Sequence, residues 1–310
     1  MQIQMQRPPN PVSSPPRSFE SRLSRLKAWT LIPVTSIPLL AWAVIAEACG
    51  VSDYTSRQMT SAILYAAMLG WWLVLAAPRP YSVRATMRRP LDRAGYGLVL
   101  RASLGVLCLG FLAVLGRQSG DLLRAASSGA TATIRLTLTD DDPANLIALA
   151  FSVVVAPLVE ELVFRATLFR AWRVRWSPVV ALLVSSVLFG AGHKFAVNSF
   201  LAGVTFALLY TRTGSLWANV LCHSLNNAAW AVVGGLHYFW AAPQLDLKGP
   251  VDYGALALTV LIGTGVWLHF VIKSWRTLGA PLSPDSPPAT SSVPSPPIPS
   301  EALRFGRRLS

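Results

Sequence analysis

Apolar runs about as long as a membrane span recur along this chain, and they constrain its fold more than any other feature. A helix of roughly 20 residues crosses the ~30 Å of hydrocarbon in a bilayer. Only 13% of the 310 residues are charged, against about a quarter in soluble domains. The sequence therefore predicts an all-α polytopic membrane protein with about eight transmembrane helices, at residues 28–48, 59–77, 95–116, 145–167, 177–195, 198–212, 215–236 and 254–273.

The two ends of the chain differ from its apolar middle. Residues 1–18 contain five prolines and residues 281–300 contain eight. Such segments bury too little apolar area to offset the entropy of ordering them. We therefore expect four parts: a disordered basic tail at 1–27, membrane helices one to three with their loops at 28–144, a core of helices four to eight at 145–273, and a disordered Pro/Ser-rich tail at 274–310.

The basic residues indicate how the helices are oriented in the bilayer. The chain carries 27 Lys+Arg against 14 Asp+Glu, a formal net charge of +13. Arginines concentrate before the first span and in every second connection after it, which places both termini in the cytoplasm by the positive-inside rule. No basic stripe with interleaved aromatic residues is present in the sequence, so we expect no nucleic-acid partner.

Two adjacent carboxylates, Glu160 and Glu161, lie well inside the fourth span. An ionisable group there costs at least ~2.5–3.5 kcal/mol on insertion scales, so each carboxylate needs a partner, a proton or a water-filled cavity. Glu161 and Arg165 have the i,i+4 spacing of a helical ion pair, whereas Glu160 is rotated by about 100° around the helix. We expect Arg165 to neutralise Glu161 and to leave Glu160 as a candidate general base.

Two histidines and an amide also occur in apolar surroundings. His193 follows Phe189 by four residues and His223 precedes Asn227 by four, so each pair shares one helix face. Taken singly, such groups are equally explained as hydrogen-bonding residues between packed helices. Together with the carboxylates they would supply a base, an imidazole to orient water and donors for an oxyanion, which are the requirements of catalysis by activated water.

Three motifs follow one another on successive spans: Glu160-Glu161-x-x-x-Arg165, Phe189-x-x-x-His193 and His223-x-x-x-Asn227. Over about residues 145–236 this arrangement resembles the CPBP family of intramembrane glutamic endopeptidases, also called the Abi family, which is related to the Rce1-type CAAX prenyl protease. The resemblance implies an eight-helix core and a mechanism that uses neither a metal nor a cofactor. It also implies that 145–273 is the catalytic part of the chain.

The resemblance assigns catalytic roles to four residues. Glu160 would be the general base, His193 would hold and activate the nucleophilic water, and His223 with Asn227 would form the oxyanion hole. The implied activity is hydrolysis of a peptide bond near the C-terminus or the membrane anchor of a membrane-associated protein. We expect a membrane-anchored or C-terminally tagged protein as substrate, a bacterial inner membrane as location, and a protein-sorting protease as the variant within the family.

The remaining motif residues would support the site. Glu161 with Arg165 would form a structural ion pair, and Phe189 would pack beside the site. The depths of the residues conflict with this scheme, since at about 1.5 Å per residue Glu160 would lie over ~20 Å from the outer end of its span. His193 would lie a similar rise from the inner end of the next span. Straight, fully inserted helices would therefore hold Glu160 and His193 at different depths.

Two other functional classes remain open on the sequence. One is a zinc-dependent membrane protease that uses Glu160, His193 and His223 as three metal ligands, although no HExxH motif is present. The other is a non-enzymatic membrane protein that acts in immunity or binds a partner. No internal repeat of interrupted spans is found in the sequence, which argues against a transporter.

Overall fold

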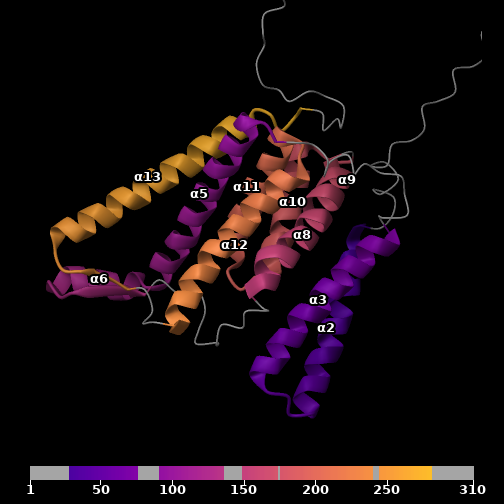
Figure 1. Ribbon diagram of the computed structural model, residues 1–310, viewed down its shortest axis with the longest axis horizontal. Coiled ribbons are helices and arrows are strands. Elements are labelled where there is room, and N and C mark those ends of the chain that lie inside the picture. The colour runs from indigo at the N-terminus through magenta and orange to yellow at the C-terminus, as the bar shows by residue number, and fades with distance from the viewer. Residues whose placement is uncertain (1–27, 76–90, 136–148, 174, 240–243, 281–310) are drawn as a thin grey trace, which may run out of the picture.

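The computed structural model of this protein describes residues 28–75, 91–135, 149–173, 175–239 and 244–280. These residues form a bundle of helices with one small sheet (Figure 1). The helices are η1 (Ala28–Thr30), α2 (Leu31–Ala48), α3 (Asp53–Leu75), α5 (Arg93–Arg117), α6 (Ser119–Ser128), η2 (Phe151–Val155), α8 (Ala156–Glu161), η3 (Leu162–Phe169), α9 (Arg170–Arg173), α10 (Pro178–Ala191), α11 (Ala196–Thr213), α12 (Leu216–Phe239) and α13 (Pro250–Trp275).

A helical segment occurs at each of the eight predicted spans, so the all-helical membrane fold is confirmed. Among the described residues, three helices are long and apolar enough to cross a membrane: Ala28–Ala48, Arg93–Arg117 and Pro250–Trp275. The chain is an integral membrane protein. The number of eight crossings stays a prediction.

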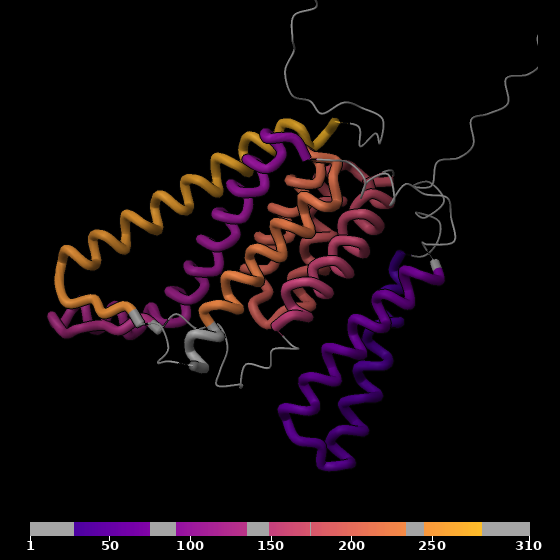
Figure 2. Tube along the Cα trace, viewed as in Figure 1, coloured from indigo at the N-terminus to yellow at the C-terminus, as the bar shows by residue number. Residues whose placement is uncertain are grey.

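The helices pack around α5, α11 and α12 in the middle of the bundle. α13 lies along α5 and α10 lies along α11, while the hairpin of α2 and α3 stands at the opposite side of the molecule from α13 (Figure 2). One end of this hairpin contacts α8 and η3 through α3. The fourth predicted span, the stretch from η2 to α9, therefore packs between the N-terminal hairpin and the rest of the bundle.

Local sequence signals explain several helix ends. Asp92 caps α5 by accepting a hydrogen bond from the backbone N–H of Gly95 over 2.7 Å. Ser177 caps α10 in the same way through Val180, with Pro178 at the first helical position. α11 ends at Gly214, whose φ of 59° lies in the left-handed region that glycine adopts without strain.

The fourth span is not a regular α-helix. The short α-helix α8, which carries both glutamates, is flanked by the π-helical segments η2 and η3. Within η3 the hydroxyl of Thr167 donates to the carbonyl of Leu162, five residues earlier. π-helical turns are rare and are often found at functional sites, and here they change the direction of side chains on both sides of the glutamate pair.

Two details of the architecture were not anticipated from the sequence. The described residues include a two-stranded antiparallel sheet, in which β1 (Ala132–Arg135) pairs with β2 (Gln244–Leu247), as a small addition to the helical bundle. The strands are four residues long and stand far apart in sequence, so no local alternation marks them. Ordered structure also continues past the predicted start of the C-terminal tail at 274, since α13 ends at Trp275 and both Ser274 and Leu278 are buried. The rest of both predicted tails, 1–27 and 281–310, lies outside the described residues.

Candidate active site

Glu160 is at the centre of the site and is only 5% exposed. Its Oε1 atom accepts a hydrogen bond from the hydroxyl of Tyr65 on α3. Its Oε2 atom lies 3.8 Å from Nε2 of His193 and 3.8 Å from Nε2 of His223. Oε2 is buried and has no hydrogen-bond partner among the described residues. The two oxygens of this carboxylate therefore have different surroundings, one anchored and one facing two imidazoles.

Glu161 is fully buried, and both of its carboxylate oxygens have partners. Its Oε1 atom lies 3.3 Å from Nη1 of Arg165, the ion pair expected from the i,i+4 spacing. Oε1 also lies 3.1 Å from Nδ1 of His223, and Oε2 accepts from Nδ2 of Asn219 over 3.0 Å. The charge of this glutamate is thus balanced by Arg165, and three side chains hold its two oxygens.

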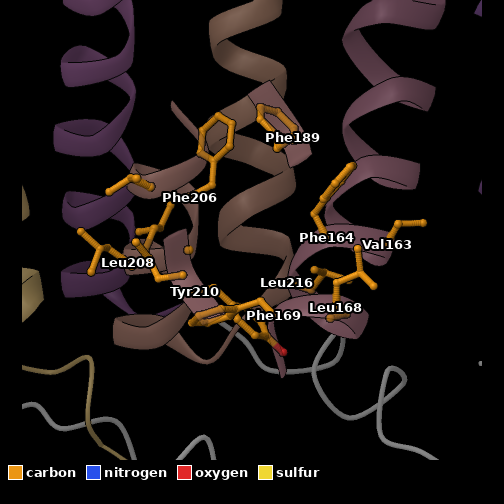
Figure 3. Packing of buried hydrophobic residues seen from close by; sticks show 14 of the residues in the cluster. Val163, Phe164, Leu168, Phe169, Phe189, Phe206, Leu208, Tyr210 and Leu216 are labelled. Atoms are coloured by element: carbon orange, nitrogen blue, oxygen red, sulfur yellow. The ribbon is translucent and has the colours of Figure 1, made fainter. Parts of the chain in front are cut away.

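Aromatic rings and a backbone carbonyl surround the guanidinium of Arg165, which is 1% exposed. Its carbon Cζ lies over the rings of Phe189 and Phe206, 4.4 and 5.3 Å from their centroids. Nη2 donates to the carbonyl of Gly203 over 3.1 Å. Figure 3 shows both phenylalanines among the buried hydrophobic side chains. Desolvated cation–π contacts of this kind stabilise a buried arginine by roughly 2 kcal/mol.

His193 lies just after the end of α10, where the chain turns into α11. Its side chain is 35% exposed, and its Nδ1 atom is 2.7 Å from the carbonyl of Phe189. A carbonyl only accepts, so Nδ1 is the donor and Nε2 faces Glu160; in the neutral imidazole, Nε2 carries the lone pair. Gly190 allows this turn, because a Cβ at that position would lie 2.6 Å from the carbonyl oxygen of Ala196.

His223 is oriented in the same way by a different acceptor. Glu161, paired with Arg165, is an ionised acceptor, so Nδ1 of His223 donates to it and Nε2 faces Glu160. The imidazole stacks on the ring of Phe206 with centroids 4.8 Å apart. Both Nε2 atoms therefore lie 3.8 Å from Oε2 of Glu160, and in the neutral imidazoles all three atoms are acceptors. A water molecule between Oε2 and one Nε2 atom would have one proton to donate to each.

The depth conflict expected from the sequence disappears because the fourth helix is longer than predicted. It continues without a break from residue 149 to Arg173, six residues past the predicted end at 167. Glu160 precedes Arg173 by 13 residues and His193 follows Pro178 by 15, which at ~1.5 Å per residue are rises of about 20 and about 22 Å. These two helices are antiparallel neighbours, so Glu160 and His193 lie level.

Asn227 is the one predicted catalytic residue that is not in contact with the carboxylates in the described structure. Its Nδ2 atom donates to the carbonyl of Ser152 over 2.8 Å. Ser152 lies in η2, and Asn227 lies one turn beyond His223 on α12. Phe189 lies beside the site as expected, with its ring centroid 4.6 Å from that of His193.

Sequence reasoning missed two residues of this site. Asn219 is fully buried and donates to both Glu161 and the carbonyl of Phe206; its position four residues before His223 was a usable signal, because it shares that helix face. Tyr65 lies 95 residues before Glu160 on an apolar helix, and no pattern in the sequence connects the two. Tyr65 lies outside the predicted catalytic part at 145–273.

The zinc alternative can be compared with the same geometry. Glu160, His193 and His223 do converge. Even so, no group of three or more His, Cys, Asp and Glu side chains in the described ranges has an arrangement that could hold a metal ion.

Comparison with known proteins bears on the part of the chain that carries the site. Residues 142–229 match the family described as Type II CAAX prenyl endopeptidase Rce1-like. All three motifs lie within these residues, so the resemblance drawn from them is confirmed: this part of the chain is similar to the Rce1-like family.

A curated relative matches part of the same chain. A protein of Bacillus subtilis (strain 168) with the name "Putative membrane peptidase YdiL" is 37% identical over 79 residues. The match covers 24% of this chain and 32% of the relative, so the chain spans about a third of that protein's length. No solved structure matches the chain.

Proposed function

We propose that this protein is an intramembrane endopeptidase of the glutamic type, in which Glu160 activates a water molecule. The observation that carries the proposal is the buried Oε2 atom of Glu160, which has no hydrogen-bond partner in the described residues and lies 3.8 Å from each of two imidazole nitrogens. A purely structural carboxylate at this depth would have both oxygens satisfied, as Glu161 has. The Rce1-like match and the name of the Bacillus subtilis relative support the same activity.

In this mechanism the water donates one proton to Oε2 of Glu160 and the other to an Nε2 lone pair. The water oxygen attacks the carbonyl carbon of the scissile bond while its proton passes to Glu160, which then donates it to the nitrogen of the leaving amine. His193 orients the water through Nε2, since its Nδ1 is held by the carbonyl of Phe189.

The oxyanion needs hydrogen-bond donors at the same point. His223 supplies one in its imidazolium form, whose Nε2 proton is taken up from solvent before the substrate binds, and the ionised Glu161 at Nδ1 stabilises that imidazolium. Asn227 has a second amide hydrogen besides the one given to Ser152. We assign this hydrogen to the oxyanion, with the bond to Ser152 fixing the amide.

The substrate we propose is a membrane-anchored or C-terminally tagged protein that is cut near its C-terminus or its anchor. A site with its base buried among membrane helices reaches a peptide bond only in a chain already at the bilayer. The same proposal places the protein in a bacterial inner membrane, and the arginine pattern supports cytoplasmic positions for both termini.

The test compares the wild-type protein with the Glu160→Gln variant, in which the amide still accepts from Tyr65 but cannot take a proton. Membrane proteins of cells that carry each form are compared by quantitative mass spectrometry, and we expect an uncut protein to accumulate only with Glu160→Gln. Purified protein is assayed in parallel on fluorescence-quenched peptides ending in a CAAX sequence, with and without a farnesyl group.

The two readouts separate the competing functions. Equal cleavage by wild type and Glu160→Gln would overturn the glutamic mechanism. Full biological activity of Glu160→Gln in cells, without any accumulating substrate, would favour the non-enzymatic immunity or partner-binding class instead.

The second candidate function is a zinc-dependent membrane protease. The lone pairs of Glu160, His193 and His223 that would receive a water proton could also ligate a zinc ion. We rank it below the glutamic mechanism because the described side chains lack the arrangement of a metal site. Dialysis against a chelator decides between the two.

A further inference from the structure

We propose that Tyr65, on the N-terminal hairpin, is a positioning residue for the general base. By donating to Oε1 of Glu160 it fixes the carboxylate so that Oε2 is the atom that takes the proton from water. This inference rests on the proposed function, but the contact on which it depends is measurable without any substrate. Tyr65 lies outside residues 142–229, so the Rce1-like match does not cover it.

The hydrogen bond from Tyr65 gives the two oxygens of the Glu160 carboxylate different surroundings. Oε1 is occupied by the tyrosine hydroxyl, whereas Oε2 faces Nε2 of His193 and Nε2 of His223. A carboxylate turns easily about its last torsion, and no other described side chain donates to Glu160. Without the hydroxyl, nothing in the described structure would hold Oε2 toward the imidazoles.

Tyr65 is itself held firmly enough to act in this way. Its ring packs edge to face on Phe151 with centroids 5.1 Å apart. On the same face of α3, Met68 and Trp71 are 4% and 3% exposed. The indole of Trp71 donates to Thr30 over 3.0 Å, which ties α3 to the start of the first helix.

The same face of α3 docks the N-terminal hairpin onto the rest of the helical bundle. α3 meets the catalytic segment at α8 and η3, the two elements that carry Glu160, Glu161 and Arg165. The hydroxyl of Tyr65 is therefore the polar end of an otherwise apolar contact. The hydroxyl of a half-buried tyrosine among apolar helices is best satisfied by a polar partner, and here that partner is the proposed base.

A kinetic experiment tests the positioning role. Tyr65→Phe keeps the ring on Phe151 and removes only the hydroxyl. We expect kcat to fall by about 10- to 100-fold, the loss that a misplaced catalytic group causes, with KM changed less than about twofold. Tyr96→Phe, which removes a hydroxyl from a residue 55% exposed on α5, is the matched control and should keep wild-type kcat. The substrate is the quenched CAAX peptide or the protein that accumulates in Glu160→Gln cells.

A second experiment tests the contact without proteolysis, by thermal unfolding of full-length protein in detergent. We expect Tyr65→Phe to lower the unfolding temperature by about 2–4 °C in the wild type and by less than about 1 °C in Glu160→Ala, since the partner is then already gone.

The outcomes separate the two proposals. Equal shifts in both backgrounds would show that Tyr65 does not donate to Glu160 and would overturn the inference. Unequal shifts with wild-type kcat for Tyr65→Phe would overturn the positioning role alone. Unequal shifts with no cleavage by the wild type of any substrate tried would leave the contact standing and count against the proposed function.

Discussion

Nδ1 of His223 lies 3.1 Å from Oε1 of Glu161, so the second glutamate orients one of the two imidazoles that face the first. From the sequence, Glu161 was expected to pair with Arg165 and to act only as structural support. The ion pair is present, and the same oxygen also sets which nitrogen of His223 carries the proton. The two adjacent glutamates are thus connected through the imidazole as well as through the backbone.

Removing Glu161 should reduce both stability and activity. Glu161→Ala leaves the buried guanidinium of Arg165 uncompensated, which costs about 3–5 kcal/mol. His223→Ala keeps that ion pair, so it should cost less stability while still losing cleavage. Thermal unfolding in detergent compares the two variants. A Glu161→Ala protein that unfolds like the wild type yet cleaves nothing would exchange the roles of the two glutamates.

His193 should be replaceable without unfolding the protein, because its side chain is 35% exposed. We expect His193→Ala to reduce cleavage by about 10²-fold or more, since it removes an acid–base partner of the water, with an unfolding temperature close to that of the wild type. Val197→Ala, at a residue 76% exposed just beyond the same turn, serves as the control. Substantial activity in His193→Ala would remove this residue from the mechanism.

The turn between α10 and α11 should tolerate no side chain at Gly190. A Cβ there would lie 2.6 Å from a backbone oxygen, whereas at Gly192 the nearest atom is 3.7 Å away. Gly190→Ala should therefore cost about 1–3 kcal/mol through overpacking and displace His193, while Gly192→Ala should be close to neutral. Unfolding temperature and cleavage rate measure both effects. Equal behaviour of the two variants would contradict the close approach of the helices.

We expect Asn219 to be required for stability, although none of the three sequence motifs contains it. Asn219→Ala leaves Oε2 of Glu161 without its amide donor in a fully buried place and removes the side-chain hydrogen bond to the carbonyl of Phe206, at a cost of about 1–3 kcal/mol for the unsatisfied carboxylate oxygen. Asn219→Asp keeps the shape but adds a second charge beside Glu161, so it should be less stable than Asn219→Ala. The order of the two unfolding temperatures checks this account.

Metal removal should leave the enzyme active if the carboxylate alone activates the water. We expect dialysis against EDTA or 1,10-phenanthroline to change the rate of peptide cleavage by less than about twofold, because Glu160 takes the proton directly. Loss of activity that added zinc restores would instead support the three-ligand zinc site of Glu160, His193 and His223.

Local rules predicted the parts of the site that lie within one helix. The i,i+4 spacing of Glu161 and Arg165 and of Phe189 and His193 holds in the structure, because neighbouring turns bring such residues together whatever surrounds them. The end of the fourth span was misplaced for a related reason. Buried residues such as Trp172 follow its last apolar run, and hydrophobicity alone does not show that a helix continues through arginines.

Spacing rules within one helix could not predict the contacts between helices. Tyr65 reaches Glu160 across 95 residues, and the pairing of β1 with β2 joins segments that are separated by more than a hundred. Asn227 was expected at the oxyanion and is found bound to Ser152, whose carbonyl belongs to a π-helical turn. Nothing in the residue types of that turn indicates the change from α-helical geometry.

The sequence by itself determined that this chain is a helical membrane protein and which costly polar residues must meet, because burying a charge in a bilayer penalises every arrangement that leaves it alone. Only the tertiary structure decided how they meet: which oxygen of Glu160 stays unoccupied by protein donors, and which helix supplies the hydroxyl that holds the other. These depend on where whole helices dock, and docking is set by shape and packing summed over many side chains rather than by any local pattern.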